Sequence, residues 1–87
     1  MSLIVGNYID MLKCESFLDK ATNRIRVRPL PGQDVPTIMV IECLKKIREE
    51  HKIGTHFIAE NVKVCKKPDG RMYLRAKNQI IKKIELK

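Results

Sequence analysis

The chain has 87 residues, of which 44% are hydrophobic and 32% are charged, and its formal net charge is +8. This length fits one domain, residues 1–87, and this composition argues against wholesale disorder. A domain this small hides only about 60–65% of the surface of its unfolded chain, so we expect no deep active-site cavity.

The N-terminal segment is predicted to form a short helix from Asn7 to about Leu18. Asn7 is an N-cap candidate. Four side chains then fall on one side of such a helix: Tyr8, Met11, Leu12 and Leu18. Because Phe17 lies off this stripe, an extended conformation of residues 8–14 is the alternative.

Residues 24–28 show the clearest strand pattern. Ile25 and Val27 alternate with three arginines, Arg24, Arg26 and Arg28, which predicts apolar side chains inside and guanidinium groups outside. Side chains on one strand face recur at about 6.6–6.8 Å. That spacing is similar to the phosphate spacing of an extended nucleic-acid strand, so the arginines are candidates for following its backbone. The alternative is an edge strand whose charges prevent aggregation.

Residues 29–36 contain three prolines and predict a rigid connector. A main amphipathic helix is expected from Val35 to Lys52, with Asp34 as its N-cap and Gly54 ending it. The predicted buried stripe contains Val40, Cys43, Leu44, Ile47 and His51.

A further strand is expected over residues 55–60, with Phe57 buried. The alternation changes phase near Glu60-Asn61, which predicts a bulge or bend there. Residues 77–79 should form a turn. Residues 80–86 then predict a last strand, or alternatively a short helix; the strand would carry on one face Ile80, Ile84 and Leu86.

Between these elements, residues 61–77 predict one β-hairpin around the turn Pro68-Asp69-Gly70. Its register would pair Lys67 with Arg71, Cys65 with Tyr73, Lys63 with Arg75 and Asn61 with Lys77. One face would then carry Lys63, Cys65, Lys67, Arg71, Tyr73, Arg75 and Lys77. The other face would carry Val62, Val64, Met72, Leu74 and Ala76.

Together these elements predict an α+β fold: a small antiparallel sheet of about four strands, packed against one main amphipathic helix, with a short N-terminal helix. No apolar run is long enough to span a bilayer, and Leu3-Ile4-Val5 is too short for a signal-peptide core. Three widely spaced cysteines, Cys14, Cys43 and Cys65, favour reduced thiols. We therefore expect a cytoplasmic protein that does not contact a membrane.

The charge distribution and Tyr73 provide the functional hypothesis. Residues 61–87 hold nine of the 18 basic residues and only two acidic ones, Asp69 and Glu85. An aromatic ring on a sheet can stack an unpaired base while neighbouring cations hold phosphates. The candidate site for DNA or RNA contains Lys63, Lys67, Arg71, Tyr73, Arg75 and Lys77, together with Arg24, Arg26 and Arg28. The alternative is a solvated basic face with no ligand.

Other site chemistry is not expected. The sequence contains no CxxC or HxxxH spacing, so no metal site and no cofactor are predicted. Cys65 among cations is the best candidate for a nucleophile, but no histidine is predicted to reach it, so no catalytic residue is assigned. We expect a non-enzymatic basic binding domain. The alternative is a protein-interaction or self-assembly module whose partner is an acidic protein or a second copy, as in a homodimer.

Overall fold

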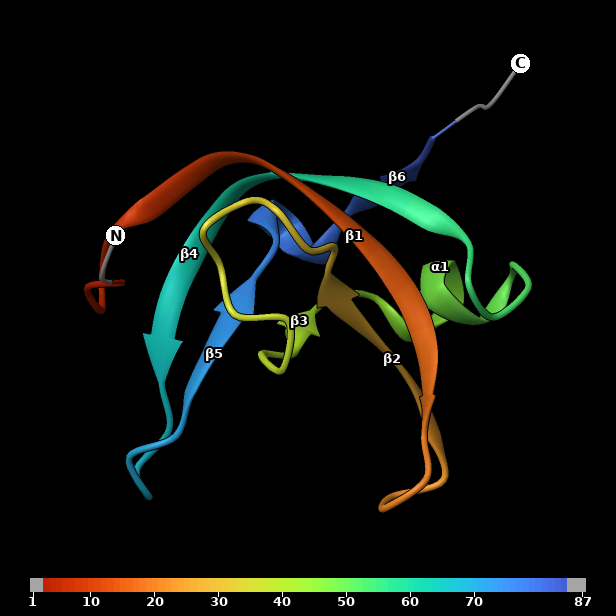
Figure 1. Cartoon of the computed structure of the whole chain (residues 1–87), viewed down its shortest axis with the longest axis horizontal. Coiled ribbons are helices and arrows are strands. Elements are labelled where there is room, and N and C mark those ends of the chain that lie inside the picture. Colours follow the sequence, from red (N-terminus) through yellow and green to blue (C-terminus); the bar gives the residue numbers. More distant parts are fainter. Residues whose placement is uncertain (1–2, 85–87) are drawn as a thin grey trace.

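The computed structural model describes residues 3–84, and a single bent sheet of six strands dominates it (Figure 1). The strands are β1 (Tyr8–Asp19), β2 (Arg24–Pro29), β3 (Ile41–Glu42), β4 (His56–Lys66), β5 (Met72–Arg75) and β6 (Ile81–Lys83). The helical segments are α1 (Lys45–Glu49) and the 3₁₀ turn η1 (Lys77–Gln79). The fold is therefore mostly β, and the predicted α+β class is wrong.

The strand order is that of a small Greek-key barrel. Strand β1 pairs antiparallel with β4 through its first half and with β2 through its second half. Strand β5 pairs antiparallel with β4, and β3 runs parallel to β5. Strand β2 lies next to β3, which brings the order back to its start and leaves the barrel partly open there. This strand order, with a helix between β3 and β4, resembles that of the five-stranded OB-fold, and β6 pairs antiparallel with β4 in addition.

The N-terminal helix that we predicted is wrong, because residues 8–19 form the longest strand. Leu12, Cys14 and Ser16 are buried, and the residues between them are exposed or half-buried, which is the period of two expected for a strand. The extended alternative for residues 8–14 is confirmed. The β1 backbone forms hydrogen bonds with a strand on each side. These bonds to distant parts of the chain stabilise the extended conformation more than the weak helical pattern stabilises a helix.

The main helix predicted over residues 35–52 is also wrong. Only Lys45–Glu49 are helical, and α1 buries none of its side chains. The apolar residues before it alternate instead, because Met39, Ile41 and Cys43 are buried. Their backbone joins β5, since the Leu74 N–H donates to the Val40 carbonyl at 2.9 Å. Filling the gap between β2 and β5 with a strand buries these side chains inside the barrel.

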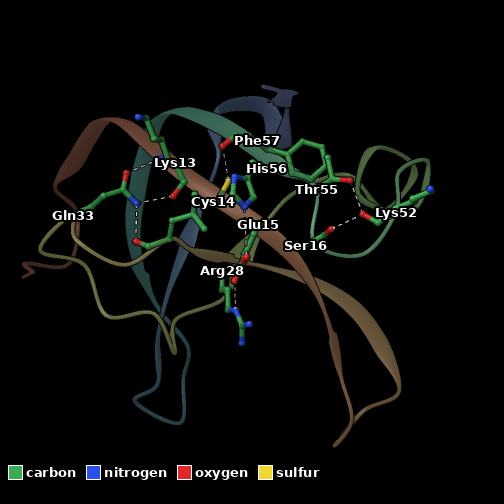
Figure 2. Close-up of polar contacts among 11 residues, drawn as sticks. Lys13, Cys14, Glu15, Ser16, Arg28, Gln33, Lys52, Thr55, His56 and Phe57 are labelled. Carbon is green, nitrogen blue, oxygen red and sulfur yellow. Dashed lines mark hydrogen bonds and ion pairs between the residues drawn. The ribbon is translucent and has the colours of Figure 1, made fainter. Parts of the chain in front are cut away.

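A glutamine side chain holds the proline-rich connector against β1 (Figure 2). The Gln33 amide donates to the backbone carbonyls of Lys13 (2.7 Å) and Leu30 (2.8 Å). Its carbonyl oxygen accepts the Lys13 N–H at 2.8 Å. These bonds satisfy β1 backbone groups where the β2 pairing ends, so the connector is ordered without regular structure of its own.

The hairpin register is confirmed from the turn to the pair Lys63–Arg75, whereas the predicted pairing of Asn61 with Lys77 is wrong, because Asn61 lies at the bend in β4 and Lys77 begins η1. Strands β4 and β5 pair Lys63 with Arg75 and Cys65 with Tyr73, and the Lys67 N–H donates to the Arg71 carbonyl at 2.8 Å. Four residues predicted on the inner face are buried: Val62, Val64, Leu74 and Ala76. They face the barrel interior rather than a long helix. Met72 departs from the prediction, since it is 38% exposed.

The bend predicted in β4 is confirmed, and the phase predicted for the last strand is wrong. Asn61 has a φ of 47°, and burial shifts from Phe57 and Ala59 to Val62 at this point. At the start of β6, Ile81 is buried, whereas the preceding Ile80 is 46% exposed, the reverse of the expected faces. Leu86, which we placed on the inner face, lies outside the described residues.

Candidate nucleic-acid interface

A groove runs between the tips of the two long hairpins. In Figure 1 the β1–β2 and β4–β5 hairpins extend in the same direction, with β3 and the loop before it between them. The groove between them, called here the interhairpin groove, has a volume of about 550 Å³. It is lined by Asp19, Ala21, Thr22, Arg26, Ile38, Val40, Ile41, Glu42, Arg48, Lys67, Arg71, Met72 and Tyr73. Segments from four parts of the chain therefore build one site.

Apolar side chains and one aromatic ring form part of the groove lining. Val40 comes from the strand-like segment before β3, and Met72 and Tyr73 come from β5. Ile38 is 90% exposed, which is unusual for a residue of its type. Apolar contact and a ring face are what an unpaired base requires, so the lining can accept bases as well as phosphates.

Four cations surround this lining: Arg26, Arg48, Lys67 and Arg71. The Lys67 ammonium lies 5.5 Å from the centroid of the Tyr73 ring. The Arg48 guanidinium is held by a hydrogen bond of 2.7 Å from Nη1 to the Cys43 carbonyl. The cations come from both walls of the groove, so a bound anion would meet positive charge on two sides.

Some of this charge is compensated inside the protein. Arg26 forms an ion pair with Asp19, and Arg71 forms one with Asp69, each with an N–O distance of 3.0 Å. The backbone N–H and guanidinium of Arg71 lower the pKa of the Asp69 carboxyl, so this group is anionic at neutral pH. Glu42 adds a further carboxylate to the lining. Both pairs are partly or largely exposed, and such pairs contribute little and exchange partners readily.

Tyr73 is a neutral aromatic side chain at physiological pH. Partial burial raises the pKa of its phenol, and Cys65 and Glu42 raise it further. Because the ring is half-buried on β5, its orientation is fixed by the sheet while part of the ring remains accessible. A ring held in this way loses little freedom when a base stacks on it.

The other two arginines of β2 lie outside the groove lining. Arg28 forms an ion pair with Glu15 at 3.0 Å and lies over the Phe17 ring at 4.5 Å. Figure 2 shows this pair beside His56, whose Nε2 is 3.9 Å from the other Glu15 oxygen. Arg24 is exposed at the start of β2 and does not line the groove. Of the three arginines predicted to follow a nucleic-acid backbone, only Arg26 therefore lines the groove.

The remaining predicted residues gather elsewhere. Lys63, Arg75 and Lys77 line a second pocket together with Tyr8. The structure thus divides the predicted site into two groups on one hairpin face, with Lys67, Arg71 and Tyr73 in the interhairpin groove. The sequence analysis missed Arg48 because that residue was assigned to the predicted main helix. It missed Tyr8 because that residue was assigned to the predicted N-terminal helix.

Two of the three cysteines are buried in the core, and the third has a partly exposed thiol. Burial raises the pKa of Cys14 to about 12, and burial likewise raises the pKa of Cys43. Cys65 is partly exposed beside Tyr73. Within residues 3–84, histidines, cysteines and carboxylates form no group of three or more that could hold a metal ion.

Comparison with known proteins adds no assignment: no family model, curated protein or solved structure matches the chain significantly. In the part of the chain that the structure describes, no helix is long and apolar enough to cross a bilayer. Any functional conclusion therefore depends on the chemistry of the groove.

Proposed function

We propose that the protein binds single-stranded nucleic acid in the interhairpin groove and is not an enzyme. The observation that carries this proposal is the position of Tyr73: it lies beside the facing pair Lys67 and Arg71 on one wall, while Arg26 lines the groove from the other hairpin. Stacking on the ring would hold a base, and the cations would hold the phosphates on either side of it.

The internal contacts at the groove are weak enough to be exchanged for a ligand. A cation over an exposed aromatic ring is worth about two- to fivefold in an equilibrium constant. A stacked base is worth about 5- to 150-fold. A base would therefore displace the Lys67 ammonium from the Tyr73 ring, and the ammonium would remain close enough to pair with a phosphate.

The apolar lining favours a single strand over a duplex. A duplex presents mainly phosphates and sugars, and it would leave Ile38, Val40 and Met72 without a partner. An unpaired strand can turn its bases toward these side chains. In OB-folds the strand 2–3 face and the loops between strands 1–2 and 4–5 are the usual ligand surface, and the interhairpin groove occupies that position. Because one fold can serve many functions, this analogy only adds to the argument from the groove residues.

Fluorescence anisotropy with a labelled oligothymidylate, titrated at several salt concentrations, tests the proposal. The variant Lys67→Glu/Arg71→Glu should bind at least about tenfold more weakly at low salt, because two attractions to phosphates become repulsions. The matched control is Lys45→Glu/Lys46→Glu on α1, which changes the net charge equally outside the groove. Equal affinities of the two double variants would show that only overall charge matters and would contradict the proposal.

The same titration separates the alternative partner, an acidic protein. Ile38 and the exposed cations would also suit an acidic chain with apolar side chains. Polyglutamate competing as well as oligothymidylate at equal charge would favour that alternative. We further propose that the protein works in the cytoplasm, where reducing conditions keep Cys14, Cys43 and Cys65 as free thiols.

A further inference from the structure

A second pocket lies on the same hairpin, beyond the interhairpin groove. Its volume is about 460 Å³. It is lined by Tyr8, Asn61, Lys63, Arg75, Ala76, Lys77 and Asn78. None of these residues lines the interhairpin groove. The second pocket has an aromatic side chain and three cations, whereas the groove has an aromatic side chain and four cations.

The backbone forms this pocket where two elements change direction. Asn61 has a φ of 47° at the bend in β4, and Asn78 has a φ of 53° in η1. Asparagine tolerates this left-handed conformation better than most residues, which explains its presence at both positions. The two bends open a hollow between β4 and the end of β5, and Tyr8, paired with Lys63 across the strands, borders it.

The charges in the second pocket are less compensated than those in the groove. The groove lining contains four cations and the carboxylates of Asp19 and Glu42. The second pocket contains three cations and no carboxylate among its lining residues. Only one of its cations has an acidic neighbour in residues 3–84, since Arg75 Nε lies 3.9 Å from a Glu42 oxygen. An anion entering this pocket would meet less competition than in the groove.

The basic face of β5 connects the two sites. Arg71, Tyr73 and Arg75 alternate along one face, with Cys65 and Lys63 opposite them on β4. Arg71 and Arg75 are four residue steps apart, an extended distance of about 13 Å. An extended single strand covers that distance in about two nucleotide steps at about 6–7 Å each. A strand leaving the groove past Tyr73 would therefore reach Lys63 and Arg75 without a break in positive charge.

We propose that the second pocket is a further subsite for the same single strand. Tyr8 is 61% exposed, and its ring would stack one base, while Lys63, Arg75 and Lys77 would hold the adjacent phosphates. This inference rests on the proposed function, because the groove supplies the first contact. It predicts that the complete site is longer than the groove and that its second part is used only by strands long enough to reach it.

The test compares two oligothymidylates, one of about four and one of about twelve nucleotides, lengths near the two ends of the range known for single OB-folds. The variant Tyr8→Ala/Lys77→Ala should bind the long strand about tenfold more weakly and the short strand less than about twofold more weakly. The groove variant Lys67→Ala/Arg71→Ala should weaken both. Lys45→Ala is the control for removal of a cation at a position that lines neither pocket.

The outcomes separate the two proposals. If Tyr8→Ala/Lys77→Ala leaves the long strand unaffected while the groove variant weakens both lengths, the second subsite is wrong and the groove proposal stands. If the Tyr8 variant weakens both lengths equally, the order of the two sites is wrong and the subsite inference falls. If neither variant changes binding, the proposed function itself is contradicted. Tyr8 and Lys77 are exposed, and circular dichroism with a thermal melt confirms that each variant is folded.

Discussion

The two hairpins that border the groove are both rich in cations, yet their charges are arranged differently. On β1–β2, acids of one strand form ion pairs with arginines of the other: Glu15 pairs with Arg28 directly opposite, and Asp19, which lies opposite Arg24, pairs diagonally with Arg26. On β4–β5, cations lie opposite cations, with Lys63 facing Arg75. One hairpin is neutralised by its own partner strand, and the other is not.

This difference favours the β4–β5 hairpin as the one that would bind the proposed ligand. Like charges placed opposite one another destabilise a sheet, whereas opposite charges stabilise it. The β1–β2 arrangement therefore serves the fold, and the β4–β5 arrangement lowers stability unless a polyanion covers it. Counting basic residues along the sequence cannot distinguish these cases, because both segments are similarly basic.

The largest expected effect is on binding affinity, and it appears when one aromatic residue of each hairpin is replaced in turn. Tyr73→Ala should weaken oligothymidylate binding by about 5- to 150-fold, because the variant has no ring on which a base can stack. Phe17→Ala, on β1 under Arg28, should leave binding unchanged. Anisotropy titrations of both variants, with Tyr73→Phe as a control that retains the ring, measure the contrast. Equal affinities for Tyr73→Ala and the parent protein would exclude stacking on Tyr73.

The next effect is on salt dependence. Lys67→Ala/Arg71→Ala should reduce the slope of log affinity against log salt by about 1.4, or about 0.7 for each single-strand phosphate that the protein no longer neutralises. Arg24→Ala/Arg28→Ala removes the same number of cations from β2 and should leave the slope unchanged. A similar reduction for both double variants would mean that the two hairpins bind the ligand equally.

A smaller effect concerns stability rather than binding. Arg28→Ala should lower the free energy of unfolding by about 0.5–1 kcal/mol, because it removes a half-exposed ion pair with Glu15 and a cation–π interaction with the Phe17 ring. Urea denaturation measures this change. Arg28→Ala should bind oligothymidylate like the parent, and weaker binding by the folded variant would count against a structural role.

The smallest expected effect is an increase in affinity for the oligonucleotide. Asp69→Asn removes an anion from the tip of the β4–β5 hairpin, next to Arg71. Binding should become about two- to threefold tighter at low salt, because Arg71 no longer has an internal partner and one carboxylate no longer repels the phosphates. The increase should disappear at high salt, where exposed charges are screened. Weaker binding would show that Asp69 instead orients Arg71 for the ligand.

Local pattern predicted the β4–β5 hairpin well, because its turn residues and alternation lie within one short segment. Register, buried face and the bend at Asn61 are all contained in residues 55–77. Residues 35–52 could not be predicted in the same way. Their spacing suits a helix by coincidence, and β3 is a strand only because β5, which is distant in sequence, lies beside it.

The candidate site was predictable only in part, for a related reason. Tyr73 and its flanking cations follow from alternation along one hairpin, and the structure keeps them on one face. The groove itself needs two hairpins and β3, which come together only in the barrel. Acids that neutralise Arg26 and Arg28 come from β1, and a wrong helix prediction for that strand concealed them.

Protection of Cys65 from alkylation tests the central claim most directly, because this thiol lies beside Tyr73 on the proposed binding face. Burial keeps Cys14 and Cys43 protonated near pH 8, so in the native protein a water-soluble reagent should modify Cys65 first, as mass spectrometry would show. Saturating oligothymidylate should slow that reaction at least about tenfold at low salt, and protection should fade as salt rises. An unchanged rate under conditions where the oligonucleotide is bound would place the nucleic acid elsewhere and contradict the account.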